Sequence, residues 1–557
     1  MLLSGADIIV RTLIEQNCDV VFGYPGGQIL NVYDSLYKYS DEIRHVLTAH
    51  EQGASHAADG YARATGKVGV VIATSGPGAT NLVTGIATAY LDSVPMVAIT
   101  GNVPTSQIGY DSFQEIDITG ITLPITKHNY FVGSVDELAD TIREAFSLAM
   151  SGRPGPVLID VPKDIQIAKC EYQPQSAVKP EEKNPAKDIR IQEAAECINA
   201  SEKPYIYFGG GLIASEAQDE LFELANKIDA PIGCSMMGLS GIHTSHPRFL
   251  GMQGMHGHYA SSMAMHNADC IISLGVRFND RVTGNKAKFA PNAKIVHIDI
   301  DGSELSKCVN AEHNLRGDIK KTLENLTAAI NGTTHPEWQK TISRFRAEEK
   351  EYSDKRDGMT PKNVIGALNT YLNENTPVAT DVGQHQMWAA QNLCFSNSRR
   401  FISSGGLGTM GFGLGAAIGA QIGTGEHAVL ITGDGSFGMC LQEMATAVSN
   451  NIPLVILILN NGVLGMVRQW QTLFFDKHYS NTVLDRKTDF IALARAFGSD
   501  GEKVSTLDGL NTAFEKAFSV NAPYVIDCTI DKDEFVLPML PPGGSMDDII
   551  VKAGEDA

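Results

Sequence analysis

Two apolar runs between residues 429 and 461 both end in residues that can bind a cation. The run VLIT is followed by Gly433, Asp434 and Gly435, and the run PLVILIL by Asn460 and Asn461. Carboxylate and amide oxygens suit Mg²⁺, which usually shares its coordination shell with phosphate groups. Glycine lets the backbone approach a ligand closely, and the start of a helix offers free N–H groups to a phosphate. The pattern therefore predicts a site for a metal ion and a phosphate group.

The segment between the two runs has the period of a helix. Leu441, Met444, Ala445 and Val448 follow the spacing i, i+3, i+4, i+7, which predicts one apolar helix face. Residues 427–461 are therefore expected to form a strand–helix–strand unit whose parallel strands end side by side. A single Asp-Gly pair is most often a turn without a ligand, but ligands do bind at the carboxyl ends of such strands.

A second candidate for chemistry is Glu51, which follows the run HVLTA at an expected helix start. An acidic residue in the first helical turn is ordinarily explained by its favourable interaction with the helix dipole. A half-buried carboxylate at a strand end is also a group that general acid–base catalysis uses. The residues alone leave both explanations open.

The rest of the chain alternates short β-branched runs with helical patterns, which predicts an α/β fold with parallel sheets covered on both faces. Two connectors, 171–188 and 331–360, are rich in Pro, Lys and Glu or strongly charged. They divide the chain into three doubly wound domains and a tail, namely 1–168, 189–330, 361–535 and 536–557.

Composition narrows the class of protein. The 557 residues carry a net charge of −20, which argues against a nucleic-acid partner. Nine cysteines without a Cys-x-x-Cys pair indicate reduced thiols in a cytoplasmic protein. The amino terminus has charged residues at helical spacing, unlike a signal peptide. No apolar run reaches the ~18 residues of a membrane span, so no membrane association is expected.

The Gly-Asp-Gly and Asn-Asn pair resembles the diphosphate-binding signature of thiamine diphosphate enzymes. Other motifs extend this resemblance over nearly the whole chain, in the order FGYPGG (22–27), HEQGA (50–54), GYARATGKVGV (60–70), TSGPGATN (74–81), FQE (113–115), GRPGPVLIDVPKD (152–164), GQHQMWAAQ (383–391), GGLGTMGFGLGAAIGA (405–420) and LGMVRQWQ (464–471). The set is similar to the catalytic subunits of the acetohydroxyacid synthase (acetolactate synthase) family.

The resemblance implies roles for residues in the two outer domains. Glu51 would polarise the pyrimidine ring of the cofactor, and the catalytic set would be Glu51, Gln114, Lys163 and Gly27. Mg²⁺ would be bound by Asp434, Asn461 and the backbone oxygen of Val463. The remaining thiamine diphosphate contacts would be Tyr24, Pro25, Gly26, Gly383, Gln384, His385, Gly408, Met410, Gly433, Gly435 and Ser436.

The middle block resembles the FAD-binding domain of the anabolic enzymes of this family. FGGGLI (208–213) is by itself only a glycine turn after a strand, but VRFNDRVTG (276–284) adds two arginines and HIDID (297–301) adds acids suited to a ribose. The implied FAD contacts are Arg153, Gly209, Gly210, Gly211, Gly251, Met252, Met255, His256, Gly275, Arg277, Arg281, Asp299, Ile300 and Asp318. The net reaction has no redox step, so this FAD would be structural.

The resemblance also implies a reaction and an assembly. Pyruvate would be decarboxylated and its two-carbon unit joined to pyruvate or 2-ketobutyrate, giving 2-acetolactate or 2-aceto-2-hydroxybutyrate for branched-chain amino acid synthesis. Substrate contacts would be Phe113, Met466 and Trp470, with Trp470 favouring 2-ketobutyrate or, alternatively, being a buried aromatic without a selective role. The site would lie between the subunits of a homodimer. A tetramer and a separate small regulatory subunit both remain open.

Three positions depart from the family pattern. Asn279 replaces a common Asp, and Tyr110 and Ser112 stand where Thr and Ala are common. The alternatives are another thiamine diphosphate enzyme, such as a pyruvate oxidase or an oxalyl-CoA decarboxylase, and a non-catalytic nucleotide-binding protein with the same fold. Trp470 and Lys163 disfavour the first alternative, and the intact Glu51 disfavours both the second and a glyoxylate carboligase.

Overall fold

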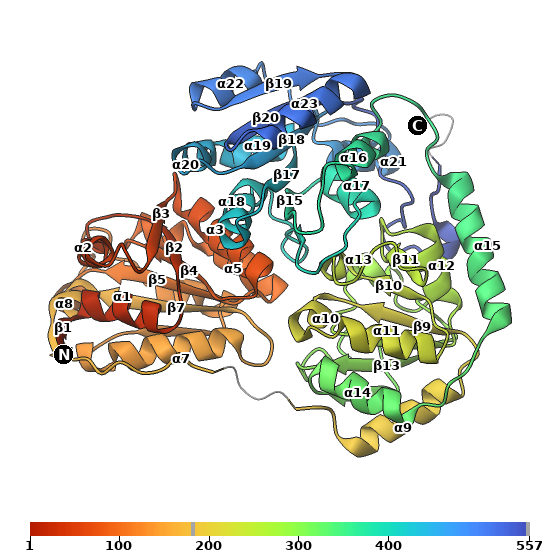
Figure 1. Ribbon diagram of the computed structural model, residues 1–557, viewed down its shortest axis with the longest axis horizontal. Helices are drawn as coiled ribbons and strands as arrows, with labels where there is room; N and C mark the ends of the chain where they lie inside the picture. Colours follow the sequence, from red (N-terminus) through yellow and green to blue (C-terminus); the bar gives the residue numbers. More distant parts are fainter. Residues whose placement is uncertain (180–183, 553–557) are drawn as a thin grey trace.

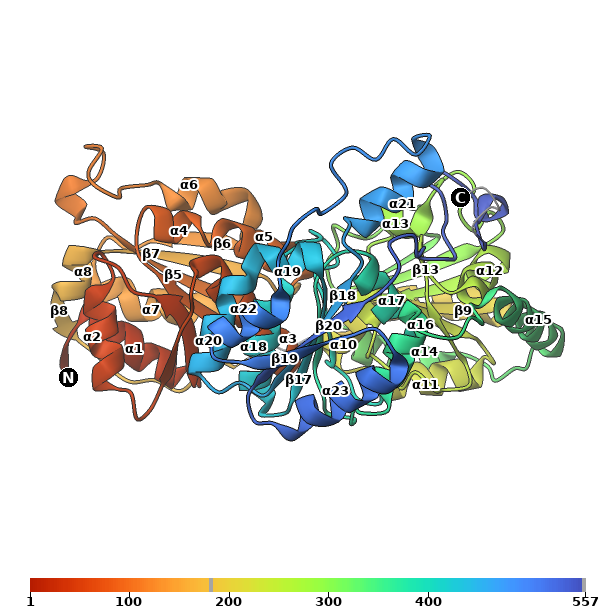
Figure 2. The same cartoon turned by 90° about the horizontal axis from the view of Figure 1, so that it is seen from above.

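The computed structural model describes residues 1–179 and 184–552. These residues form three six-stranded sheets, each within its own α/β domain (Figure 1). All strand pairs inside the three sheets are parallel, and helices cover both faces. The predicted fold class is therefore confirmed. Figure 1 shows the C-terminal domain above the other two domains, and Figure 2, seen from above, shows it over the middle of the molecule.

The N-terminal sheet has the order β3-β2-β4-β5-β7-β6. Helices α1 and α7 pack on one face and α3 and α5 on the other. The strands are β2 (Val20–Tyr24), β3 (Arg44–Leu47), β4 (Gly69–Ala73), β5 (Met96–Asn102), β6 (His128–Phe131) and β7 (Pro156–Pro162). The helices are α1 (Gly5–Glu15), α2 (Leu30–Lys38), α3 (Glu51–Thr65), α4 (Pro77–Thr80), α5 (Val83–Asp92), α6 (Ile118–Thr122), α7 (Leu138–Met150) and α8 (Lys163–Ile167). The segment continues past residue 168, because β8 (Lys169–Glu171) pairs with β1 (Leu2–Ser4).

The central sheet has the order β11-β10-β9-β12-β13-β14. Its strands are β9 (Pro204–Phe208), β10 (Ile232–Cys234), β11 (Phe249–Met252), β12 (Cys270–Leu274), β13 (Lys294–Asp299) and β14 (His313–Arg316). Its helices are α9 (Asp188–Asn199), α10 (Gly210–Ser215), α11 (Gln218–Lys227), α12 (Tyr259–Asn267), α13 (Asp280–Thr283), α14 (Ile319–Ala329) and α15 (Pro336–Tyr352). Helices α9, α11 and α14 cover one face, and α12 and α15 cover the other.

The C-terminal sheet has the order β16-β15-β17-β18-β20-β19. Its strands are β15 (Val378–Thr380), β16 (Phe401–Ile402), β17 (Ala428–Gly433), β18 (Leu454–Asn460), β19 (Asp500–Val504) and β20 (Pro523–Thr529). Its helices are α16 (Pro361–Asn369), α17 (Gln384–Asn392), α18 (Gly413–Thr424), α19 (Asp434–Cys440), α20 (Met444–Ser449), α21 (Gly465–Phe474), α22 (Phe490–Ala496) and α23 (Leu507–Ser519). The central strands are apolar throughout because both faces are buried.

The strand–helix–strand unit of residues 427–461 is confirmed, but its single predicted helix is wrong. The segment forms α19, a 3₁₀ turn (Leu441–Glu443) and α20 in succession. Ala445 is exposed, and the buried positions of α20 are Met444, Thr446 and Ala447. The break after α19 rotates the helical face, so a single 3.6-residue period cannot describe the segment.

Helices α3 and α18 join the N-terminal and C-terminal domains. A Cβ atom on Gly415 would lie 2.8 Å from Gly53 O, and a Cβ on Gly60 would overlap the backbone of Ala416. Small residues therefore let the two helix backbones approach directly, which fixes one domain against the other. The tail after residue 535 packs on the central domain, where Leu540 N donates to Met255 O. Among the described residues, no helix has the length and apolar character needed to cross a bilayer.

Candidate active site

The predicted metal residues meet at the carboxyl edge of the C-terminal sheet. Asp434 is the first residue of α19, directly after β17, and Asn461 directly follows β18, which lies beside β17. Burial raises the pKa of Asp434 to about 6, while backbone N–H groups, including that of Asn461, act in the opposite direction. The Asn461 side chain accepts a hydrogen bond from Val463 N (3.1 Å). Carboxylate and amide oxygens thus lie together in the donor set that Mg²⁺ prefers.

His385 lies beside this cluster at the start of α17. A Cβ on Gly433 would lie 2.9 Å from its Nδ1, and one on Gly383 would lie 2.9 Å from its Cε1. Burial lowers the pKa of His385 to about 3, so the ring is neutral. Its Nε2 is buried and has no hydrogen-bond partner among the described residues. A buried polar atom without a partner fits a site that a ligand oxygen completes.

Gln384 and the following loops complete this edge. Gln384 accepts a hydrogen bond from Asn461 Nδ2 (3.3 Å) and donates to Gln469 Oε1 (3.0 Å). Met410 Cε lies 3.9 Å from a Cβ placed on Gly435, and Ser436 Oγ donates to Val382 O (3.0 Å). Gly408 has a φ of 70°, a conformation that glycine adopts without strain. The predicted residues of the C-terminal domain are therefore gathered at one strand edge.

Glu51 occupies the corresponding edge of the N-terminal sheet. It begins α3, and its Oε2 accepts a hydrogen bond from Asn81 Nδ2 (3.0 Å). Tyr24 ends β2 nearby and is 41% exposed. A Cβ on Gly26 would meet the side chain of Thr74, so the loop of Pro25 to Gly27 sits tightly on the end of β4.

The other residues predicted for catalysis and substrate binding in the N-terminal domain lie in two groups. Lys163 Nζ donates to Gly27 O (3.1 Å), which joins the start of α8 to the loop after β2. Gln114 has a φ of 61°, and its backbone and Cβ lie about 3 Å from a Cβ placed on Gly76. Phe113 is 82% exposed. Lys163 and Gly27 are in contact, whereas the loop of Phe113 projects into solvent.

Within one chain, the segment at the start of α3 contacts residues of the C-terminal domain other than Asp434. Among the described residues, no hydrogen bond or ion pair joins Glu51 to the cluster around Asp434. Instead, Ala49 N donates to Glu443 Oε2 (3.1 Å) and to Thr446 Oγ1 (3.0 Å). These partners lie beyond the carboxyl end of α19, while Asp434 begins that helix.

A cavity of about 1120 Å³ lies between the central and C-terminal domains, with Asp92, Ser93 and Arg153 of the N-terminal domain in its wall. Its wall contains most of the predicted FAD residues, namely Arg153, Gly210, Gly211, Met252, Met255, His256, Gly275, Arg277, Arg281, Asp299 and Ile300. Gly209, Gly251 and Asp318 are not part of the wall. Gly209 packs against Gly275 O, Gly251 packs against His258, and Asp318 caps α14 through Lys321 N.

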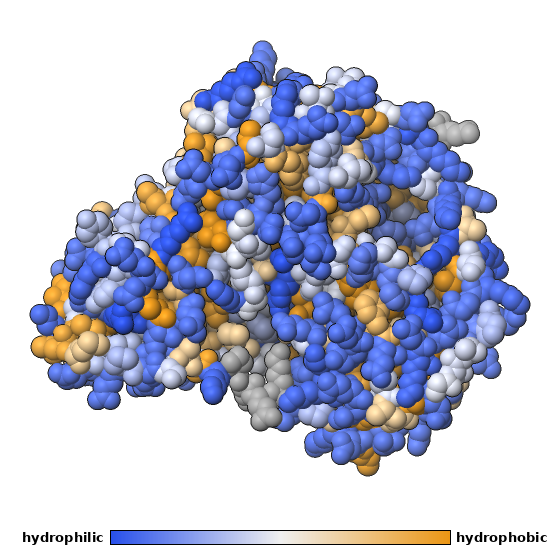
Figure 3. Space-filling view, in the orientation of Figure 1, coloured by the Kyte–Doolittle hydropathy of each residue, from blue (hydrophilic) through white to orange (hydrophobic). Residues whose placement is uncertain are grey.

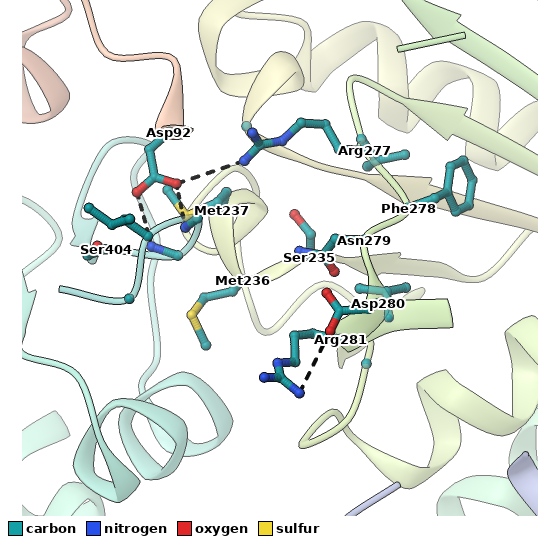
Figure 4. Close-up of a pocket in the computed structure, with 18 of the residues that line it drawn as sticks. Asp92, Ser235, Met236, Met237, Arg277, Phe278, Asn279, Asp280, Arg281 and Ser404 are labelled. Atoms are coloured by element: carbon teal, nitrogen blue, oxygen red, sulfur yellow. Dashed lines mark hydrogen bonds and ion pairs between the residues drawn. The ribbon is translucent and has the colours of Figure 1, made fainter. Parts of the chain in front are cut away.

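Charged groups line this cavity (Figure 4). Arg153 Nη1 lies 2.8 Å from Glu304 and 3.5 Å from Asp301. Burial and the neighbouring Arg153 lower the pKa of Arg277. Burial raises the pKa of Asp299 to about 6, and its carboxylate accepts a hydrogen bond from Asp301 N (2.8 Å). The two arginines can bind a diphosphate, and the carboxylate at the strand end can bind a ribose.

Helix α21 connects the cavity with the C-terminal edge. Met466 and Trp470 line the cavity together with Gly408, and Trp470 meets Phe474 edge to face at 5.7 Å. Gln469 on the same helix is buried and bonds to Gln384. One short helix thus presents the predicted substrate residues to the cavity and supports the predicted cofactor residues.

Asp381 is a residue of this edge that the sequence analysis missed. Its buried carboxylate accepts hydrogen bonds from Gly411 N (2.7 Å), Gly413 N (3.3 Å) and Thr432 Oγ1 (3.0 Å). Burial raises the pKa of Asp381 to about 6. Its place directly after the run PVAT could have identified it as another polar strand end.

The three departures lie in two places. Asn279 lines the cavity at the start of α13. Tyr110 is 79% exposed, and Ser112 Oγ donates to Gln107 O (2.7 Å) within the same exposed loop. None of the three contacts Asp434 or Glu51.

The comparisons with known proteins agree with this geometry. Residues 3–121 match the thiamine pyrophosphate enzyme, N-terminal TPP binding domain; residues 191–326 match the central domain; and residues 381–528 match the C-terminal TPP binding domain. Fold and site thus define a thiamine diphosphate (thiamine pyrophosphate) enzyme.

Full-length relatives narrow the class. The chain is 44% identical to acetolactate synthase isozyme 2 large subunit of Escherichia coli (strain K12), covering 99% of this chain and 100% of the relative. It is 43% identical to the isozyme 3 large subunit of the same organism, covering 98% of each. It is 44% identical to the acetolactate synthase large subunit of Corynebacterium glutamicum, covering 98% of this chain and 90% of the relative. The chain belongs to the acetolactate synthase large-subunit family, whose cofactors are thiamine diphosphate, Mg²⁺ and FAD.

Proposed function

We propose that the two sheet edges form the carboligation site. In this reaction pyruvate loses CO₂, and its two-carbon unit joins a second pyruvate, giving 2-acetolactate, or 2-ketobutyrate, giving 2-aceto-2-hydroxybutyrate. Thiamine diphosphate, when bound, supplies the electron sink for the decarboxylation. The observation that carries the proposal is the convergence of Asp434, Asn461 and the unpartnered His385 Nε2 at one strand edge.

The C-terminal edge would hold the diphosphate end of the cofactor. Asp434 and Asn461 side-chain oxygens, with the backbone oxygen of Val463, would bind Mg²⁺. The backbone N–H groups in the first turn of α19 and the neutral His385 would donate to phosphate oxygens. Met410, which points toward Gly435, would support the cofactor from below.

The N-terminal edge would supply the proton-transfer carboxylate. Glu51 is oriented by the hydrogen bond from Asn81 and would hold a proton at the pyrimidine nitrogen of the cofactor. Lys163, Gly27, Gln114 and Phe113 would line the approach of the keto acid. The ammonium group of Lys163 suits the carboxylate of such a substrate.

We further propose a homodimer in which each site combines Glu51 of one subunit with Asp434 of the other. Two observations support it. Within one chain the residues just before α3 bond to Glu443 and Thr446 instead of Asp434. Exposed apolar residues also lie at both edges, namely Tyr24, Leu30 and Leu47 at the first and Leu407 and Met439 at the second. Figure 3 shows apolar side chains gathered where the N-terminal and C-terminal domains meet. A tetramer of such dimers would preserve the same sites.

The proposal also covers a partner subunit, the cellular compartment and the site of the flavin. The relatives are named large subunits, which favours a separate small subunit as a partner of this chain. All nine cysteines are free, which favours a reducing compartment such as the cytoplasm. The flavin would occupy the 1120 Å³ cavity and stabilise the three-domain arrangement without a redox role.

Product analysis tests the proposed reaction. The purified chain is incubated with thiamine diphosphate, Mg²⁺, FAD and an equimolar mixture of pyruvate and 2-ketobutyrate. The proposal predicts one CO₂ for each carboligation product, with 2-aceto-2-hydroxybutyrate in excess because Trp470 offers a flat apolar wall to the acceptor. Release of CO₂ with free acetaldehyde or acetate as the main product would contradict it.

A further inference from the structure

Asp92 joins all three domains at one carboxylate (Figure 4). It is the last residue of α5, and its side chain is completely buried. Its Oδ2 accepts hydrogen bonds from Arg63 Nη2 (2.9 Å) and Gly405 N (3.0 Å). Its Oδ1 accepts one from Gly406 N (2.7 Å) and lies 3.9 Å from Arg277 Nη2. One side chain of the N-terminal domain thus contacts both the C-terminal and the central domain.

The loop that Asp92 holds in the C-terminal domain runs from residue 403 to residue 412 and carries two predicted cofactor contacts, Gly408 and Met410. A Cβ on Gly406 would lie 2.8 Å from Asp92 Oδ1, so the loop backbone rests directly on the carboxylate. Thr88, four residues earlier in α5, shares a hydrogen bond with Thr409 (2.8 Å). The position of this loop therefore depends on the end of α5.

Arg63 reinforces the same loop from α3. Its Nη1 donates to Ser403 O (2.9 Å), and its guanidinium lies 5.4 Å from the centre of the Phe412 ring. Arg63 is also paired with Asp59, one helical turn earlier. Asp92 is therefore one of two carboxylates that fix Arg63 beneath the loop.

On the flavin side, the residue pair Asp92–Ser93 contacts two cavity arginines. Ser93 Oγ accepts a hydrogen bond from Arg153 Nε (2.8 Å), and Arg277 approaches Asp92 Oδ1. Both arginines line the cavity assigned above to FAD. Asp92 Oδ1 is therefore hydrogen-bonded to Gly406 N, and Arg277 lies within ion-pair distance of the same oxygen.

We propose that Asp92 is a positioning residue that couples occupancy of the flavin cavity to the affinity for thiamine diphosphate. An anionic diphosphate in the cavity would attract Arg277 away from Asp92, whose negative charge would then be balanced by Arg63 and by the N–H groups of Gly405 and Gly406, so its bonds to the 403–412 loop would strengthen. This inference rests on the proposed function only for the assignment of the two cofactors to their sites. Because such coupling is reciprocal, thiamine diphosphate tightens FAD binding by the same factor.

The test is a binding measurement that needs no turnover. The dissociation constant of thiamine diphosphate with Mg²⁺ is measured by quenching of protein fluorescence, with and without saturating FAD, for the full chain. We expect FAD to lower this constant on the order of 10-fold in the wild type, as coupled sites typically do. In D92N the factor falls to about one. The matched control is D140N, which changes an exposed carboxylate of the same domain and keeps the wild-type factor.

A second variant keeps the inference testable if D92N does not fold. R277Q removes the cavity arginine that pairs with Asp92 but leaves the Asp92–Arg63 pair intact, so thiamine diphosphate should bind with the same constant whether or not FAD saturates the variant. FAD affinity itself is followed by flavin fluorescence. Coupling that persists in R277Q or in folded D92N, or that is absent from the wild type, would overturn the proposal. A lack of carboligation with intact coupling would instead contradict only the proposed reaction.

Discussion

The carboxyl edges of the N-terminal and C-terminal sheets share one strand-end geometry but differ in how far one chain completes them. At the C-terminal edge, Gln384 ties Asn461 to Gln469, and His385 is enclosed beside Gly433. At the N-terminal edge, Glu51 accepts one side-chain hydrogen bond within the described part of the chain, from Asn81, and apolar residues around it are exposed.

The difference indicates a division of labour within one fold. The edge proposed to bind the metal and the diphosphate is held together within one chain, because Asp381 and Gln384 bond to its loops. The edge proposed to exchange a proton would gain the rest of its surroundings from the second subunit of the proposed dimer. The central sheet differs from both, because the ends of its strands line the cavity between the domains.

The largest loss of activity is expected from a change at the N-terminal edge. E51Q keeps the shape and the hydrogen bond from Asn81 but cannot exchange a proton, so kcat should fall about 10²- to 10⁴-fold, the usual contribution of a general acid or base. Steady-state carboligation kinetics measure it, with E42Q, a change of an exposed glutamate, as the control. An E51Q enzyme with kcat within tenfold of the wild type would remove Glu51 from proton transfer.

A change at the C-terminal edge should weaken cofactor binding instead of impairing proton transfer. H385A removes the neutral donor beside Gly433, and a hydrogen bond to a charged phosphate is worth roughly 1.5–3 kcal/mol, so the dissociation constant of thiamine diphosphate should rise about 10- to 100-fold. Fluorescence quenching by the cofactor measures it. H427A serves as the control, because His427 bonds to Val520 O away from the edge. An unchanged constant would show that His385 has only a packing role.

The selectivity for the acceptor keto acid should change less than the activity and the cofactor affinity described above. W470L removes the aromatic wall of the cavity, and differences of one or two apolar contacts change discrimination about 10-fold. The ratio of 2-aceto-2-hydroxybutyrate to 2-acetolactate should fall by roughly that factor while CO₂ release stays near the wild-type rate. The product ratio of W470F, which keeps an aromatic ring, should lie between those of W470L and the wild type. An unaltered product ratio would assign Trp470 to packing against Phe474 alone.

The smallest effects are expected in the exposed loop. Y110T and S112A restore the residues common in the family and touch neither edge, so each should change the free energy of unfolding by less than about 0.5 kcal/mol. Thermal unfolding and initial rates measure them. A loss of activity beyond about twofold, with unfolding unchanged, would place this loop in the working site.

Local patterns in the sequence predicted the strand ends well. The apolar runs before Asp434 and Asn461 indicated buried parallel strands, and the structure pairs them as neighbours. The same reasoning failed for the helix between them, because the 3₁₀ turn at Leu441–Glu443 has no distinct local signal and exposes Ala445.

The long-range partners of two carboxylates were beyond local patterns. Asp381 is recognisable as a polar strand end, but the loops that Asp381 and Asp92 bind lie 30 or more positions away in the chain, and no spacing indicates such partners. In the proposed dimer the counterpart of Glu51 would belong to another subunit, which no local pattern can indicate. Only the motif resemblance linked Glu51 to the metal edge, since neither composition nor periodicity connects them.

Complementation between two inactive variants tests the shared site most directly. E51Q and D434N are mixed in equal amounts under conditions that exchange subunits, with exchange verified by native mass spectrometry. Each mixed dimer would contain one site with both residues intact, so activity should recover to about one quarter of the wild-type value when half of the dimers are mixed. Activity that stays at the sum of the two parent variants, despite complete exchange, would contradict an active site built between subunits.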